Sequence, residues 1–215
     1  GIAPLLGLTS LKDLDLRSTS ITDKGLSKLS RLQSLESLGL NAELVTEAGV
    51  SFLLDMLKLE KLALYGNITD EILHRISRLK LKELRFWQNI TEAELLHFSN
   101  MKSLESLDFA SCKGINGEDG FTHLQGLNLT YLRLYDTGTT DVGLMHLASM
   151  TNLEHLDLEE CNCISDEGLT HLSGLTSLKS LELSLCEGIS ESIKENPLGY
   201  LEKLRNATDG AEGET

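Results

Sequence analysis

The stretch LEHLDLEECNCISDEGLTHLSGLTS, residues 153–177, contains two different hydrophobic periods. Its first part, LEHLDL, has leucine at the first, fourth and sixth positions, and the alternation of Leu156 and Leu158 with polar residues is typical of a short strand with one buried face. Its second part, ISDEGLTHLSGL, has leucines three residues apart, a spacing that predicts a short helix. One such unit cannot bury its apolar side alone, so we expect it to stack against similar units.

Seven further copies of this unit can be aligned along the chain, and their first leucines are regularly spaced. The eight copies begin at Leu11, Leu35, Leu59, Leu81, Leu104, Leu129, Leu153 and Leu178. Successive starts are 24, 24, 22, 23, 25, 24 and 25 residues apart, within the range of leucine-rich repeats. An accident of composition would not hold leucine at the same positions in every copy, so the chain is predicted to be a repeat protein.

The sequence resembles the leucine-rich repeat family over residues 2–190, and the motif LxxLxLxx(C/T)xxITDxGLxxL resembles the cysteine-containing type found in F-box substrate receptors and in bacterial and protist proteins. Two copies that show the motif carry Thr19, Ile21, Thr22, Asp23 and Gly25, and Cys161, Ile164, Ser165, Asp166 and Gly168. Two middle copies depart from it, with Ile72 and Glu94 in place of the glycine. The resemblance implies an α/β solenoid, a horseshoe with a concave parallel β-sheet and short convex helices.

The repeats divide the chain into four parts. We expect residues 1–10 to be the end of a truncated preceding repeat in a longer array, 11–190 to be the eight repeats, 191–206 to form a C-terminal capping helix, and 207–215 to be a disordered acidic tail. Asn196 and Pro197 are suited to the N-cap and the first turn of the capping helix. In the repeats, Asp23, Asp141 and Asp166 are expected to cap their own helices.

Composition argues against several classes of partner and chemistry. Asp and Glu number 33 against 19 Lys and Arg, and the resulting charge of −14 disfavours nucleic acid. The sequence has no apolar run long enough to cross a membrane and no basic, apolar leader. It also lacks phosphate-binding loops, zinc-protease motifs and nucleophile elbows, so we expect neither catalytic residues nor a cofactor. We expect a monomer in isolation.

Three cysteines share one column, eight residues after the first leucine of their repeats: Cys112, Cys161 and Cys186. Other repeats have Thr19, Asn67, Asn89 or Thr137 there. The column is where the chain leaves the strand, and small side chains are expected to pack under or bond to the turning backbone. The alternatives are metal binding, redox chemistry, or a Cys161–Cys186 disulfide across adjacent repeats. Cysteines without clustered terminal pairs favour a reducing, cytoplasmic compartment.

Two further patterns leave alternatives open. Four N-x-T sequons, at Asn67, Asn89, Asn128 and Asn206, would permit glycosylation in a secreted protein, although only Asn206 is expected to be accessible. A column of histidines occurs at His97, His123, His146 and His171. Stacked imidazoles could bind a metal or respond to pH, but ligands in single file do not converge, so we favour a repeated solvent-facing position and no metal site.

The strand positions that alternate with the leucines point away from the core. In YLRLY, residues 131–135, they are two tyrosines and an arginine. The middle repeats hold the one Trp and three of the four Tyr, with arginines beside them, and the last repeats are acidic. Tyr, Trp and Arg are enriched at binding hot spots, although strand aromatics can also simply pack on one another. The predicted binding residues are Tyr65, Arg85, Trp87, Tyr131, Arg133, Tyr135, Asp157 and Glu159.

These features predict a non-catalytic module that binds another protein on its concave face, as an adaptor, substrate receptor or effector. The alternative is the recognition arm of a larger enzyme, such as a ubiquitin ligase, whose catalytic or F-box part lies outside this sequence.

Overall fold

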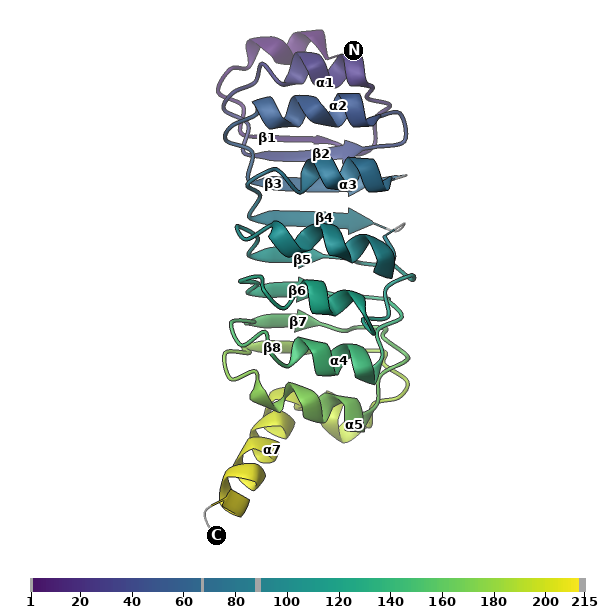
Figure 1. Cartoon of the computed structure of the whole chain (residues 1–215), viewed down its shortest axis with the longest axis vertical. Coiled ribbons are helices and arrows are strands. Elements are labelled where there is room, and N and C mark those ends of the chain that lie inside the picture. The colour runs from purple at the N-terminus through teal and green to yellow at the C-terminus, as the bar shows by residue number, and fades with distance from the viewer. Residues whose placement is uncertain (1, 67, 88–89, 213–215) are drawn as a thin grey trace.

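The computed structural model describes residues 2–66, 68–87 and 90–212, and within them the repeats form one continuous parallel sheet. The strands follow one another in sequence order, so each repeat adds one rung beside the previous one. The strands are β1 (Asp13–Leu16), β2 (Ser37–Asn41), β3 (Lys61–Tyr65), β4 (Glu83–Trp87), β5 (Ser106–Asp108), β6 (Tyr131–Arg133), β7 (His155–Asp157) and β8 (Ser180–Glu182). This is the predicted leucine-rich repeat solenoid, with strands stacked in one layer and helices in the other (Figure 1).

The register of the sheet follows from the leucine pattern. The leucine at the fourth position of each repeat pairs with its equivalent in the next: Leu14, Leu38, Leu62, Leu84, Leu107, Leu132, Leu156 and Leu181 form one continuous column. All but Leu14, in the first rung, are buried. Because a strand's side chains alternate between faces, this column fixes which residues point to the other face of the sheet.

The second layer consists of short helices, because only a few residues remain to cross back between consecutive strands. The α-helical segments of the repeats are α1 (Asp23–Leu29), α2 (Glu47–Ser51), α3 (Asp70–Ile76), α4 (Asp141–Leu147) and α5 (Asp166–Leu169). The 3₁₀ segments are η1 (Ala3–Gly7), η2 (Phe52–Asp55), η3 (Glu92–Asn100), η4 (Gly120–His123) and η5 (Thr170–Gly174). In the centre, phenylalanines replace leucines in the core, and the rings of Phe86, Phe98 and Phe109 lie 5.5–5.9 Å apart.

The aspartates expected to cap their own helices have a different role, so that prediction is wrong. The N-caps of α1, α4 and α5 are Thr22, Thr140 and Ser165, and the aspartate is the first helical residue. Asp141 instead accepts hydrogen bonds from the backbone N–H and the hydroxyl of Ser165 in the next repeat, at 2.8 and 2.6 Å. Asp23 contacts Thr46 of its next repeat in the same way, at 2.8 and 2.7 Å. Each carboxylate therefore joins two repeats.

This bridge explains two of the glycines in the repeat motif, Gly49 and Gly168. A β-carbon on Gly168 would overlap the carboxylate of Asp141, and one on Gly49 would overlap that of Asp23. Where the glycine is replaced, the bridge changes. Next to Glu94, the preceding Asp70 bonds His97 Nε2 at 2.6 Å instead.

The chain ends in α6 (Glu191–Lys194) and α7 (Pro197–Glu212), and α7 extends away from the end of the stack (Figure 1). Asn196 Oδ1 accepts a hydrogen bond from Gly199 N–H at 3.1 Å, while Leu201 is completely buried against the last repeats. The helix continues six residues beyond the expected boundary at 206, through residues that include the strong helix former Ala207. Residues 213–215 of the expected tail lie outside the described residues. No helix within the described ranges is long and apolar enough to cross a bilayer.

Candidate functional site

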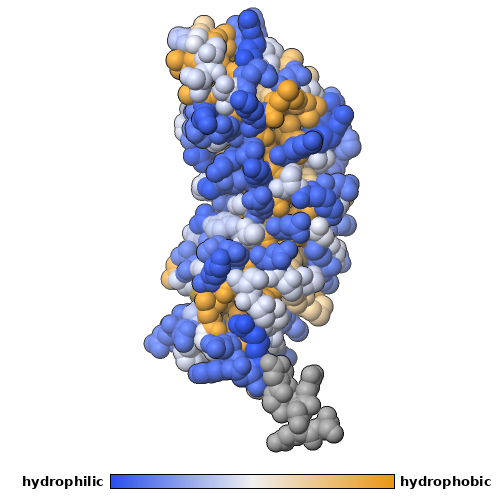
Figure 2. Space-filling view, turned by 90° about the vertical axis from the view of Figure 1, so that its left-hand side faces the viewer, coloured by the Kyte–Doolittle hydropathy of each residue, from blue (hydrophilic) through white to orange (hydrophobic). Residues whose placement is uncertain are grey.

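The helices cover one face of the sheet, and we call the other the open sheet face. It consists of the strand residues that alternate with the buried leucines, together with the residues that continue this alternation up to two positions after each strand. Figure 1 shows the strands and helices as two separate layers, and Figure 2 shows that hydrophilic side chains cover most of the flank of the stack. All eight predicted binding residues belong to the open sheet face, because each occupies one of these positions in β3, β4, β6 or β7, or the second position after β6 or β7.

An aromatic pair lies toward the N-terminal half of this face. Tyr65 of β3 is in direct register with Trp87 of β4, and Tyr65 is 40% exposed. The guanidinium carbon of Arg17, which follows β1, lies 5.8 Å from the centre of the Trp87 ring, within cation–π range. The pair therefore has an apolar surface open to solvent on one side and a cation against the indole.

The charged residues of the next rungs form a ladder of alternating sign. Arg85, Asp108, Arg133 and Asp157 are register partners on consecutive strands. Arg133 Nε donates to Asp157 Oδ2 at 2.8 Å, and Arg133 Nη1 lies 3.8 Å from Asp108 Oδ2. Arg85 is paired with Glu83 at 2.5 Å. Both arginines of the predicted site are thus compensated by acids of the chain itself.

Asp108 is the most unusual member of the ladder, since it is only 4% exposed although it belongs to the open sheet face. Burial raises the pKa of its carboxyl above the ordinary 3.8, and this shift is partly offset by the Ala110 N–H bonded to Oδ1 at 2.9 Å and by the charges of Arg133 and Arg85. The buried carboxyl has little contact with water, so its charged form depends on the arginine beside it.

A second aromatic group lies on β6 and just after it. The guanidinium of Arg133 lies 4.9 Å from the centre of the Tyr135 ring, and the rings of Tyr131 and His155 are 6.2 Å apart. Burial is the main cause that raises the pKa of Tyr131. These residues hold one another in place, and Asp157 Oδ1 accepts a hydrogen bond from the N–H of the half-buried Glu159.

The structure therefore brings the predicted residues together as two groups on one face. The first is Tyr65 with Trp87 and Arg85 of β4, and the second is Tyr131, Arg133 and Tyr135 with the acids Asp157 and Glu159. Asp108 and the buried Ala110 of the intervening rung lie between the groups in the order of the strands.

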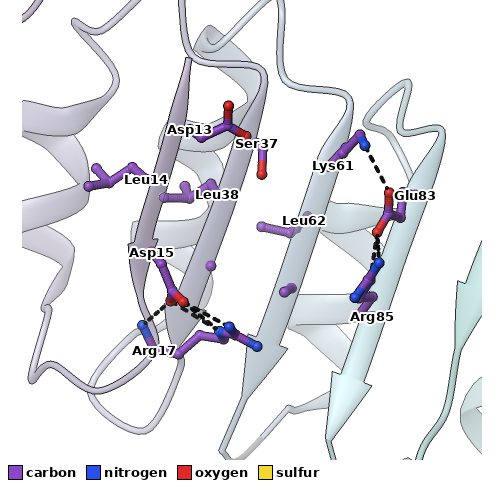
Figure 3. Close-up of a pocket in the computed structure, with 12 residues that line it drawn as sticks. Asp13, Leu14, Asp15, Arg17, Ser37, Leu38, Lys61, Leu62, Glu83 and Arg85 are labelled. Carbon is purple, nitrogen blue, oxygen red and sulfur yellow. Dashed lines mark hydrogen bonds and ion pairs between the residues drawn. The ribbon is translucent and has the colours of Figure 1, made fainter. Parts of the chain in front are cut away.

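A hollow on the open sheet face was missed by the sequence analysis. It has a volume of about 520 Å³ and lies over β1–β4 (Figure 3). Two small residues, Gly39 and Ala63, are register partners at its floor, and charged side chains form its rims. The sequence could have predicted this hollow, because two small outward residues on consecutive strands leave the space above them unfilled.

The cysteine column supports packing rather than chemistry at Cys161 and Cys186. Each is buried, and its Sγ donates to a carbonyl of the preceding repeat, Leu134 at 3.1 Å and Leu158 at 3.0 Å. Burial is the main cause that raises the pKa of both thiols, that of Cys186 to about 11. The two form no disulfide, and Cys163 is exposed.

The structure places the histidine column and two of the four sequons. In the part of the chain that the structure describes, no three His, Cys, Asp or Glu side chains gather as metal ligands would. Asn67 and Asn89 lie outside the described residues, while Asn128 is exposed as well as Asn206, contrary to the expectation that only Asn206 is accessible.

Comparison with known proteins supports the fold. A family model described as "Leucine Rich repeat" matches residues 7–30 and 149–173. No curated protein matches the sequence. Among solved structures, an internalin (InlF) of Listeria monocytogenes is 21% identical with a TM-score of 0.56, covering 94% of this chain and 62% of its own. TLR13 in complex with ssRNA13 is 18% identical with a TM-score of 0.55, covering 84% of this chain and 29% of its own.

A leucine-rich repeat protein of Leptospira interrogans is also similar, at 20% identity and a TM-score of 0.49, covering 88% of this chain and 52% of its own. The chain thus spans less than two thirds of the length of each of these three structures.

Proposed function

We propose that this chain, a leucine-rich repeat solenoid by its fold, is a non-catalytic module that binds another protein on its open sheet face, the concave side of a horseshoe. The observation that carries the proposal is the Tyr65–Trp87 pair, which is in register on a face that no described helix covers. Repeat packing does not require exposed aromatic residues, whereas protein interfaces are enriched in them.

The charge of the chain favours a protein over a nucleic acid as the partner. One structural neighbour, TLR13, was solved in complex with a single-stranded RNA, but this is a property of TLR13. The present chain carries a net charge of −14, and Asp157, Glu159 and Glu182 lie at the C-terminal end of the open sheet face. A phosphate backbone would be repelled there, while a protein segment with basic residues would be attracted.

Two finer assignments belong to this proposal. We assign the repeats to the cysteine-containing type, supported by the bonds of Cys161 and Cys186 to the preceding repeat. We also propose a cytoplasmic location for the module, because the buried thiols of Cys161 and Cys186 and the exposed Cys163 suit a reducing compartment.

Site-specific photocrosslinking tests the proposal. A photoreactive phenylalanine analogue would replace Tyr65 on the open sheet face and, in a matched control, Met145, which is also exposed but lies on α4 in the helix layer. We expect a crosslinked protein from position 65 that is absent from position 145. Crosslinking to the same protein only from position 145 would place the interface on the helices and contradict the proposal.

A further inference from the structure

The hollow over β1–β4 has the size of a ligand site and an uneven distribution of charge. Its volume of about 520 Å³ falls within the range of clefts that hold ligands. The floor depends on glycine, because a β-carbon at Gly39 would lie 2.8 Å from Asp15 Oδ1 and 3.1 Å from Arg17 Cγ. With glycine there, the Asp15–Arg17 pair can lie over β2 while the space beside it stays open.

The rim formed by β1 and β2 presents one uncompensated negative charge. Arg17 forms a two-point contact with Asp15, at 3.0 Å from Nε to Oδ1 and 2.8 Å from Nη2 to Oδ2, and these bonds lower the pKa of Asp15 to about 2. That pair is neutral overall. The side chain of Asp13 is exposed and makes no hydrogen bond or ion pair with the described residues, and the adjacent Lys12 is paired with Glu36 at 2.9 Å. Figure 3 shows Asp13 beside Ser37, its register partner.

The opposite rim, formed by β3 and β4, has a positive excess. Glu83 is the shared partner of two cations, with Lys61 Nζ at 3.2 Å and Arg85 Nη2 at 2.5 Å. Among the residues that line this side of the hollow, one carboxylate and two cations leave one positive charge; Asp108, the register partner of Arg85 on β5, does not line it. Figure 3 shows these three side chains in a row across the hollow from Asp13.

We infer that the hollow binds an oppositely charged pair of side chains on one segment of the partner, with an arginine directed to Asp13 and Ser37 and a carboxylate directed to Lys61 and Arg85. This inference rests on the proposed function, and it specifies both the chemistry of the segment and its orientation. The forked donors of an arginine suit a carboxylate and a neighbouring hydroxyl at the same time. The rims are two to three strands apart, about 10–14 Å. In an extended segment, alternate side chains point to the same side about 7 Å apart, and their flexible stems can reach both rims.

Nuclear magnetic resonance with short peptides tests the inference without a natural partner. The probe is acetyl-Arg-Ala-Glu-amide, compared with two neutralised forms in which citrulline replaces arginine or glutamine replaces glutamate. We expect the charged peptide to shift the backbone amide signals of Ser37, Gly39 and Ala63 with millimolar affinity. Each neutralised form should bind about threefold to fivefold more weakly, as expected for exposed ion pairs.

Variants of the chain identify the contact. Asp13→Asn should weaken the charged peptide by a similar factor and leave the citrulline peptide unchanged, whereas Asp55→Asn makes the same change of charge in the helix layer and should alter neither. The inference is overturned if no shifts occur in the hollow up to about 20 mM peptide. It is also overturned if the shifts concentrate at β7 and β8, or if Asp13→Asn and Asp55→Asn have equal effects. Crosslinking at Tyr65 tests the proposed function separately. If the peptide experiment fails, the crosslinking result still decides whether the open sheet face binds a protein.

Discussion

Asp141 and Gly168 share one space between consecutive repeats: the carboxylate of the aspartate lies where a β-carbon of the glycine would be. The carboxylate bonds the N–H and hydroxyl of Ser165, the residue that caps the helix containing Gly168. The aspartate and glycine of the repeat motif therefore act on each other across the repeat boundary, and stacking depends on both.

A double-mutant cycle tests this coupling. Gly168→Ala should destabilise the chain by about 1–3 kcal/mol because the new methyl group displaces the carboxylate. In an Asp141→Ala background the same change should cost clearly less, because the carboxylate is gone and only the β-carbon of residue 141, at 2.9 Å, still crowds the new methyl group. Urea denaturation of the four proteins gives the coupling free energy.

Gly174→Ala is the control, because nothing lies closer than 4.0 Å to a β-carbon there, and it should change stability by less than about 0.5 kcal/mol. Additive effects of Gly168→Ala and Asp141→Ala would show that the two residues do not share the space.

The thiols should divide into one fast and three slow classes. Native labelling with a thiol reagent at pH 8 should modify the exposed Cys163 rapidly, and the buried Cys112, Cys161 and Cys186 only after denaturant is added. Burial acts twice, because it blocks access and raises the pKa of Cys161 and Cys186, so little thiolate forms at this pH. Cys163→Ser should abolish the fast phase, and rapid labelling of more than one thiol would refute the assignment of the column to packing.

Arg133→Gln should destabilise the chain by about 1–2 kcal/mol at pH 7, a value reduced from that of a fully buried pair because Arg133 is a quarter exposed. Burial raises the pKa of Asp108 in the folded protein, so the protonated carboxyl favours folding. This contribution is fully present below the unfolded pKa of about 3.8 and is lost as the pH rises through the pKa of the folded protein. Removal of Arg133 raises that pKa further. The difference between variant and wild type should therefore shrink near pH 3.

Urea denaturation at both pH values provides the measurement for Arg133. Arg31→Gln, a change at an exposed arginine, should be close to neutral at either pH. An equal loss of stability at pH 7 and pH 3 would show that Asp108 does not depend on Arg133.

The end of the stack should depend on α7. Leu201→Ala removes a completely buried side chain and should cost about 2–4 kcal/mol, whereas the neighbouring Glu202→Ala, at an exposed position, should cost little. Deletion of residues 207–215 should also have a small effect. Thermal denaturation measures all three, and a Leu201→Ala variant as stable as the wild type would remove the capping role of this helix.

The sequence was sufficient for the repeat boundaries, the strand register and the face to which each outward residue points, because these follow from the leucine period alone. It was not sufficient for the aspartates. Asp141 lies next to the start of a helix, and only the three-dimensional stack shows that its carboxylate faces the amide of Ser165 in the following repeat.

The binding face was also predicted only in part. Once the strands are aligned, one column alternates in charge: Arg85, Asp108, Arg133 and Asp157. From this alternation the sequence could have predicted that acids of the chain compensate the arginines. The approach of Arg17 to Trp87 could not be predicted, because it depends on the directions of two long side chains from strands three rungs apart.

The most direct test of the binding face is the affinity of the crosslinked partner, once identified, for two sets of variants measured by calorimetry. Tyr65→Ala and Trp87→Ala remove the aromatic pair of the open sheet face, and Lys28→Ala and His146→Ala change side chains of the helix layer. If the open sheet face holds the partner, Trp87→Ala should weaken binding by about 2 kcal/mol or more, and the two helix-layer variants should change it by less than about 0.5 kcal/mol. Circular dichroism should show that all four variants remain folded. If the helix-layer changes weaken binding and the aromatic changes do not, the partner binds elsewhere and the Tyr65–Trp87 pair serves only packing.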